Sequence, residues 1–400
     1  MTSPSANLIR EKVSQAGEIL AEMDADLWLT FARETTMLPD PALELILGLE
    51  VTWRSIFLIS QSGRHTAILG HYDAENVRQL GIYQDVIGYH HGLREHLRLA
   101  LEGYDPARIA INFSESDVAA DGLTLGNYRT LLAYLEGTPY QERLESAEKI
   151  IAALRGRKTS REVDRMRQAI AATERLFDEV GDFVRPGMTQ RQIADFVHQR
   201  IDSAGLGYAW DKALNPIVTC GPKSSLGHAI PGDVPLERGH TLHLDLGVKI
   251  DGYCSDLQRM WYVLDKHEEH APADVQRAFD TVLAAIRAGE KALQLGAPGW
   301  QVDAAARKII VDAGYPEYMH ALGHLLGRSA HDGAAVLAPR WERYAGINEL
   351  PVESGNVFTL ELHVVVPERG VMSLEEDVLV SEQGVEYLST PQRALRYIRG

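Results

Sequence analysis

Strand-like and helical apolar patterns alternate along the first 150 residues. Short apolar runs at 55–59, 66–69 and 108–112 predict buried strands, and the stretch 75–80 predicts a helix. Alternating strands and helices favour an α/β unit. A further helix is predicted over 8–23, where apolar side chains recur at helical spacing: Leu8, Ile9, Val13, Ala16, Ile19 and Leu20.

The next segment, up to about residue 204, is mostly helical in pattern. Ser160, followed by Glu162 and Asp164, is a helix start signal, and Thr189 is a second cap candidate. A polar stretch at 155–160 separates this region from the first, so we place a domain boundary there. The predicted helices are 147–154, 162–184 and 190–204.

Helical and strand patterns mix without strict alternation in the remainder of the chain. Strands are predicted over 241–250, 356–366 and 371–380, and helices over 273–295 and 302–313. We therefore expect an α+β protein with an N-terminal α/β domain over 1–155 and a larger domain over 156–400.

Composition narrows the function classes. The 400 residues are 45% apolar and 24% charged, which is ordinary for a globular protein and excludes wholesale disorder. The net charge of −16 makes a phosphate-backbone partner a poor candidate, so we expect no nucleic acid. Two cysteines, no apolar leader and no apolar run near ~20 residues lead us to expect a cytoplasmic protein with no membrane partner.

A hairpin signal lies between two aspartates. Asp251-Gly252 is a two-residue turn signal, and a loop there pairs positions whose numbers sum to 503. Asp245 then faces Gln258, and Asp256 lies diagonally, roughly 7–8 Å away at the backbone. Two solvated aspartates would be the more common finding, but an aspartate among the aliphatic residues of a strand needs a partner. Together the two carboxylates could hold a cation.

Two glutamates form a second pair. Glu361 and Glu375 lie on consecutive strand patterns, with their midpoint at residue 368, inside the turn-like segment 367–370. A loop centred there places them directly opposite each other, where like charges destabilise a sheet. A bound cation would remove that objection.

Histidines accompany these carboxylates. His320, His324 and His331 lie within twelve residues, and His228 lies in the loop-like segment 224–231. Any one of them alone is more commonly structural or exposed. Four carboxylates with one imidazole suit divalent ions such as Mn, Co or Zn. Two such ions, roughly 3.5–4 Å apart, can hold a hydroxide and polarise a carbonyl.

The order Asp, Asp eleven residues on, His, Glu, Glu resembles the dinuclear pita-bread metallopeptidases. Matching stretches span 220–380, and residues 1–155 resemble the creatinase-like N-terminal domain of the proline-peptidase branch. The resemblance implies a C-terminal pita-bread domain that binds two divalent metal ions. It gives Asp245, Asp256, His324, Glu361 and Glu375 as the metal ligands, with Asp256 and Glu375 bridging both ions.

The resemblance also implies roles in catalysis. Glu361 would act as the acid/base for a metal-bridged hydroxide, and His228 and His331 would act on the scissile carbonyl or the gem-diolate. His320 would line the substrate pocket. Metal-free creatinase chemistry is disfavoured because all five ligands are present.

At two positions this sequence differs from the pattern that is usual in the family. Val365 stands where the family usually has Tyr, and Ser373 stands where it often has Arg, which resembles an atypical bacterial prolidase subfamily. His363 shares a strand face with Glu361. One hypothesis makes His363 a substrate-side hydrogen-bond donor that replaces the lost residue. The alternative is a histidine at the edge of the core.

The function expected from the resemblance is hydrolysis of the Xaa-Pro bond in dipeptides. Two alternatives stay open: an Xaa-Pro aminopeptidase that acts on longer peptides, and a non-catalytic peptide-binding module. The expected partners are a small peptide substrate and a second copy of the chain in a homodimer.

Overall fold

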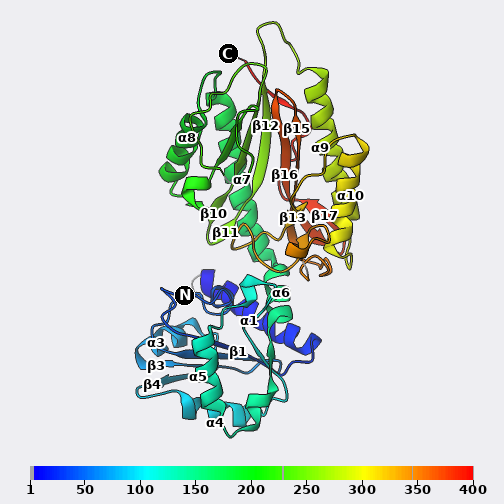
Figure 1. Cartoon of the computed structure of the whole chain (residues 1–400). Helices are drawn as coiled ribbons and strands as arrows, with labels where there is room; N and C mark the ends of the chain where they lie inside the picture. Colours follow the sequence, from blue (N-terminus) through cyan, green and yellow to red (C-terminus); the bar gives the residue numbers. More distant parts are fainter. Residues whose placement is uncertain (1–3, 228, 345, 400) are drawn as a thin grey trace. The chain divides into compact units, whose positions relative to one another are not determined.

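A computed structural model describes residues 4–227, 229–344 and 346–399 (Figure 1). The chain divides into two compact units, Met1–Arg155 and Gly156–Gly400. None of the helices in the described ranges combines the length and the apolar character that a membrane span needs.

The first unit is built on a six-stranded mixed sheet. Its strand order is β4-β3-β2-β1-β5-β6, with β1–β2 and β2–β3 antiparallel and the other pairs parallel. The strands are β1 (Leu27–Ala32), β2 (Ser55–Ser60), β3 (His65–Gly70), β4 (Asp85–Tyr89), β5 (Ile109–Ile111) and β6 (Leu144–Ser146).

Apolar cores lie on both faces of this sheet. Neighbouring residues of a strand point to opposite faces, so Trp28 belongs to one core while Leu27 and Leu29 belong to the other. The first core includes residues of α1 (Pro4–Glu22), α2 (Leu43–Ile46), α3 (His71–Leu80) and α6 (Glu148–Gly156). The second includes residues of α4 (Arg94–Tyr104) and α5 (Leu125–Leu135). The elements predicted here are confirmed, although α3 begins at His71 rather than at 75.

The second unit is built on a seven-stranded sheet. The main order is β15-β16-β12-β9-β8, and β17 and β18 pair with β16 and β12. The strands are β8 (Ile217–Cys220), β9 (Thr241–Leu246), β12 (Leu257–Val263), β15 (Val357–Val366), β16 (Gly370–Ser381), β17 (Gly384–Tyr387) and β18 (Arg396–Ile398).

Four long helices accompany this sheet. Residues of α7 (Ser160–Phe183) and α8 (Gln190–Ser203) share a core with Leu242, Leu244 and Leu246 of β9. The helix α9 (Ala273–Ala292) contacts β15 and β16, and α10 (Gly299–Asp312) packs on α9. Because side chains alternate along β9, the residues between these leucines point to the other face of the sheet.

Two details differ from the sequence prediction. The residue that caps α7 is Thr159 rather than Ser160: its hydroxyl accepts from the Glu162 backbone, and the Glu162 side chain accepts from the Thr159 backbone. The predicted strand 241–250 is also two strands, because the chain leaves the main sheet at Gly247.

Close packing surrounds the chain at this break. A Cβ atom at Gly247 would lie 2.2 Å from the carbonyl oxygen of Ser255, so only glycine fits there. Beyond it, β10 (Val248–Ile250) joins a small sheet with β7 (Gly207–Tyr208) and β11 (Tyr253–Cys254).

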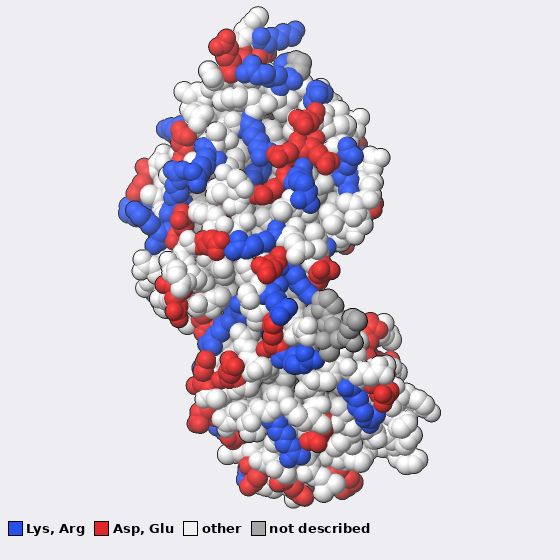
Figure 2. Space-filling model, turned by 180° about the vertical axis from the view of Figure 1, so that it is seen from behind, with Lys and Arg blue, Asp and Glu red and all other residues white. Residues whose placement is uncertain are grey.

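Helices and strands mix as expected for an α+β protein, which confirms the fold class. On the face drawn in Figure 2, acidic and basic side chains are interspersed rather than gathered by sign.

Candidate metal centre

A row of polar residues crosses four neighbouring strands. Asp245 on β9 pairs with Gln258 on β12, Gln258 pairs with Glu375 on β16, and Glu375 pairs with Glu361 on β15. Both registers predicted from the turns are confirmed. The Asp251-Gly252 turn has φ of 48° and 82°, the two positive values that a tight hairpin turn of this kind requires.

Asp256 and His324 complete the cluster. Asp256, His324 and Glu375 each offer one ligand atom, and these atoms lie within 4.8 Å of one another. The His324 Nε2 atom lies 3.8 Å from Asp256 Oδ2 and 3.7 Å from Glu361 Oε1. The backbone of His324 is held by a hydrogen bond from its N–H to the Thr359 hydroxyl on β15. The five predicted ligands therefore come together from the two hairpins and the separate segment that carries His324.

Burial and like charge make this cluster costly without a cation. Burial, reinforced by the neighbouring carboxylates, raises the pKa of Asp245, Asp256 and Glu375 well above the usual range. Burial also lowers the pKa of His324 to about 3, helped by His331. A neutral imidazole among carboxylates is the form that a metal ion requires.

Unsatisfied oxygen atoms point to the same conclusion. Within the described part of the chain, the buried atoms Asp245 Oδ1 and Glu375 Oε1 have no hydrogen-bond partner. Buried polar atoms are nearly always satisfied, so such atoms need an explanation. Oxygen-rich sites with one imidazole suit divalent ions, and these residues therefore fit a metal centre.

Two histidines stack beside the cluster. His363 lies on the Glu361 face of β15, as predicted, and its Nδ1 is 3.0 Å from His320 Nε2. Burial lowers the pKa of both rings, that of His363 to about 4, so both are neutral at pH 7.

The hydrogen-bond chain fixes which atoms carry the protons. His320 Nδ1 lies 2.7 Å from the Ala321 carbonyl oxygen and must donate to it, so His320 Nε2 accepts from His363 Nδ1. In that tautomer the second ring nitrogen, His363 Nε2, is an acceptor. A donor role for His363 Nε2 would require a second proton on the ring.

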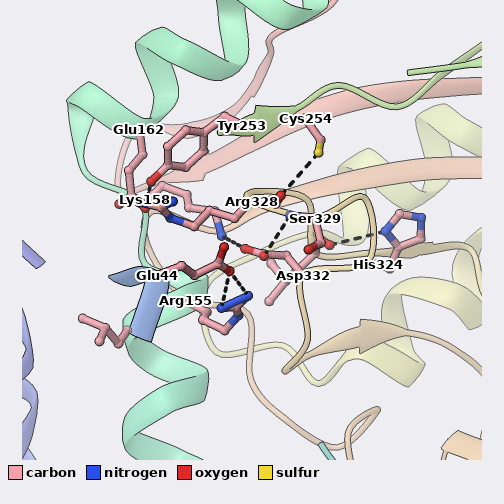
Figure 3. Close-up of polar contacts among 12 residues, drawn as sticks. Glu44, Arg155, Lys158, Glu162, Tyr253, Cys254, His324, Arg328, Ser329 and Asp332 are labelled. Atoms are coloured by element: carbon pink, nitrogen blue, oxygen red, sulfur yellow. Dashed lines mark hydrogen bonds and ion pairs between the residues drawn. The ribbon is translucent and has the colours of Figure 1, made fainter. Parts of the chain in front are cut away.

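A buried ion pair anchors the loop that follows His324. The Lys158 Nζ and Asp332 Oδ2 atoms are 2.8 Å apart, and Asp332 Oδ1 accepts from the Ser329 backbone N–H at 3.3 Å (Figure 3). The neighbouring His331 is exposed, and its ring centre lies 4.2 Å from that of His324. His228, the other predicted catalytic histidine, lies outside the described residues.

Comparison with known proteins identifies the family of the chain. The model of metallopeptidase family M24 matches residues 164–382, more than half of the chain. The chain belongs to metallopeptidase family M24.

Relatives of this M24 protein match over most of its length. An uncharacterized peptidase of Staphylococcus saprophyticus is 28% identical over 384 residues, covering 94% of this chain and 99% of the relative. A second such peptidase, from Staphylococcus haemolyticus, is 26% identical over 334 residues, covering 83% and 86%.

Solved structures share the fold. An Xaa-Pro dipeptidase from Bacillus anthracis has a TM-score of 0.74 at 21% identity, covering 98% of this chain and 100% of that one. An X-Pro aminopeptidase from Thermotoga maritima has a TM-score of 0.71 at 23% identity, covering 96% and 99%. At these identities the likeness establishes the fold, which is the predicted pita-bread architecture.

The sequence analysis gave no role to three buried polar residues around the carboxylate cluster and its neighbouring loop: His243, Gln258 and Lys158. The hairpin register could have found two of them, because Gln258 faces Asp245 and His243 lies two residues before Asp245 on the same face. No local signal identifies Lys158, whose partner lies 174 residues away.

Proposed function

We propose that the protein hydrolyses the Xaa-Pro bond of dipeptides with two divalent metal ions, Mn, Co or Zn. The supporting observation is the convergence of four carboxylates and one neutral imidazole on the sheet of an M24 metallopeptidase, where two buried carboxylate oxygens have no hydrogen-bond partner among the residues that the structure describes. Bound ions of this kind lower the pKa of a water molecule and polarise a carbonyl group.

The chain's own residues have distinct parts in this proposal. Asp245 would hold one ion and His324 the other, and Asp256 and Glu375 would be ligands shared by both. Glu361 would be a further ligand and would carry a proton from the attacking water to the leaving proline nitrogen. The proline nitrogen has no hydrogen of its own, so cleavage must deliver one.

Four histidines are assigned to the substrate in this proposal. We propose that His228 and His331 contact the scissile carbonyl group or stabilise the gem-diolate that forms from it. We assign His320 and His363 to substrate binding. Because His363 Nε2 is an acceptor in the neutral pair, the substrate group that fits it is a donor, such as the α-ammonium group of the dipeptide.

Solved structures of the same fold carry the names of both Xaa-Pro dipeptidases and X-Pro aminopeptidases. We prefer the dipeptidase and keep the Xaa-Pro aminopeptidase as the second candidate. The test offers the metal-loaded protein Ala-Pro beside Ala-Pro-Ala and measures released alanine. Release from Ala-Pro alone, abolished by a chelator, supports the dipeptidase. Release mainly from Ala-Pro-Ala supports the aminopeptidase. Cleavage of neither, with metal bound, supports a non-catalytic peptide-binding module.

The remaining assignments follow the same proposal. Residues 1–155 form a creatinase-like domain, residues 156–400 form the catalytic domain, and the working form is a cytoplasmic homodimer. Light scattering coupled to gel filtration tests the dimer, since a mass near that of one chain would contradict it.

A further inference from the structure

Gln258 is the uncharged member of a row that otherwise holds carboxylates. It lies between Asp245 and Glu375 in the pairing across the sheet. Its side chain reaches past β16, and its Nε2 atom donates to Glu361 Oε2 at 3.0 Å. This contact joins β12 to β15, which are not neighbours in the sheet.

The small side chain of Ser373 leaves room for the Gln258 side chain to reach Glu361. Ser373 lies on β16, on the same face as Glu375, and pairs with His363 on β15. Its hydroxyl lies within hydrogen-bond distance of Gln258 Oε1, the other end of the same amide, and of the Leu362 carbonyl oxygen at 3.1 Å. A long side chain at residue 373 would occupy the space that the Gln258 side chain crosses.

The surrounding contacts fix the orientation of the amide. If it were turned round, Gln258 Oε1 would face the Glu361 carboxylate, acceptor against acceptor. With Nε2 toward Glu361, Oε1 also accepts from His243 Nε2 at 2.9 Å, and His243 Nδ1 faces the Thr219 hydroxyl at 3.4 Å. Thr219, His243, Gln258 and Ser373 are all buried, so water does not compete for these bonds.

The consequence concerns the two oxygens of Glu361. Gln258 holds Oε2, while Oε1 lies 3.7 Å from His324 Nε2, on the side of the other ligands. We propose that Gln258 is a positioning residue, which fixes Glu361 so that Oε1 alone faces the metal ions and the substrate. The catalytic part of this inference rests on the proposed function, whereas the metal-binding part needs only the metal centre.

The experiment uses the full chain from which metal has been removed by a chelator, with the chelator then removed as well. This metal-free protein is titrated with Mn²⁺ alone, and binding is measured by calorimetry. Gln258→Met keeps the size of the side chain and removes the donor. Loss of a residue that orients a metal ligand typically weakens binding by about 10–100-fold, and we expect a loss in this range. The matched control is Gln392→Met, since Gln392 is equally buried but bonds to the backbone of Met260 and Ala394. It should bind Mn²⁺ within about twofold of the wild type.

A second variant separates positioning from simple loss of packing. Ser373→Ala removes the hydroxyl that holds the Gln258 amide and creates little space. It should weaken Mn²⁺ binding about threefold in the wild type and less than 1.5-fold in the Gln258→Met background, because its effect on the metal ligands passes through Gln258 and not through the Leu362 carbonyl group that the hydroxyl also contacts. With Ala-Pro at saturating metal, Gln258→Met should lower kcat at least about tenfold and change KM less than threefold.

Several outcomes would overturn the inference. These are unchanged Mn²⁺ binding in Gln258→Met, equal losses in Gln258→Met and Gln392→Met, or a Ser373→Ala effect that is the same in both backgrounds. Failure of the proposed function is distinguishable from these. A wild type that binds Mn²⁺ but cleaves neither substrate contradicts the peptidase proposal, and the titration still tests Gln258.

Discussion

Two adjacent buried glutamates on β16 should respond in opposite ways to the same substitution. Glu375 lies in the carboxylate cluster, whereas the neighbouring Glu376 is paired with the buried Arg259 at 3.0 Å. In the metal-free protein, Glu375→Gln removes a charge that has a like charge on Asp256 within 4.8 Å. At that distance and an effective dielectric constant of about 20, the repulsion is about 3.5 kcal/mol.

The gain in stability should be smaller than this, because the cluster relieves part of its repulsion by taking up protons. We expect Glu375→Gln to raise the free energy of unfolding of the metal-free protein by about 1–3 kcal/mol at pH 8. Glu376→Gln leaves Arg259 buried without its partner charge and should lower the free energy by about 3–5 kcal/mol.

The pH dependence follows from the raised pKa of Glu375. Below its unfolded pKa, near 4.5, the carboxyl is protonated in both states and resembles glutamine, so the two proteins should be equally stable there. As the pH rises, the unfolded state releases its proton first, and the wild type loses stability relative to Glu375→Gln. The gain should therefore grow between pH 5 and pH 8.

The assay is urea unfolding of chelated wild type, Glu375→Gln and Glu376→Gln, followed by tryptophan fluorescence at several pH values. Repetition with saturating Mn²⁺ should reverse the order of the first two proteins, since the substitution removes a ligand. If Glu375→Gln destabilises the metal-free protein at pH 8 as Glu376→Gln does, then the carboxylates do not repel one another and the electrostatic reasoning is refuted.

Three further predictions concern stability. Mn²⁺ at 100 times its dissociation constant should stabilise the metal-free wild type by about 2.7 kcal/mol for each ion bound, measured by the same unfolding assay; an unchanged midpoint would contradict the metal centre. Lys158→Met should cost about 3–5 kcal/mol because it removes the opposite charge beside the buried Asp332 carboxylate, and Lys158→Met with Asp332→Leu should recover part of that loss; equal losses in the single and double variants would contradict the pairing. Gly247→Ala should cost about 1–3 kcal/mol, because its Cβ would collide with the Ser255 carbonyl oxygen, whereas Gly92→Ala, with open space around it, should change the stability by less than about 0.5 kcal/mol.

The registers of both hairpins could be predicted because short turns determine them. The Asp251-Gly252 turn pairs Asp245 with Gln258, and the turn centred on Glu368 pairs Glu361 with Glu375. In each case the candidate ligands lie on the strands that flank the turn, so the turn determines which of them face each other. Local capping signals were nearly as informative, with an error of one residue at Thr159. The division of the strand at Gly247 was missed, since a glycine in an alternating pattern does not reveal which atom approaches it.

The sequence by itself determined the fold class, the two hairpins and the five candidate metal ligands, because these depend on side-chain periodicity, on turn residues and on the order of ligand types. Only the tertiary structure decided how those pieces meet. Pairing of β12 with β16 joins the hairpins into one sheet, Gln258 reaches Glu361 across a strand, and Lys158 meets Asp332 from 174 residues away. Such contacts depend on burial and packing between segments far apart in the chain, and no local pattern encodes them.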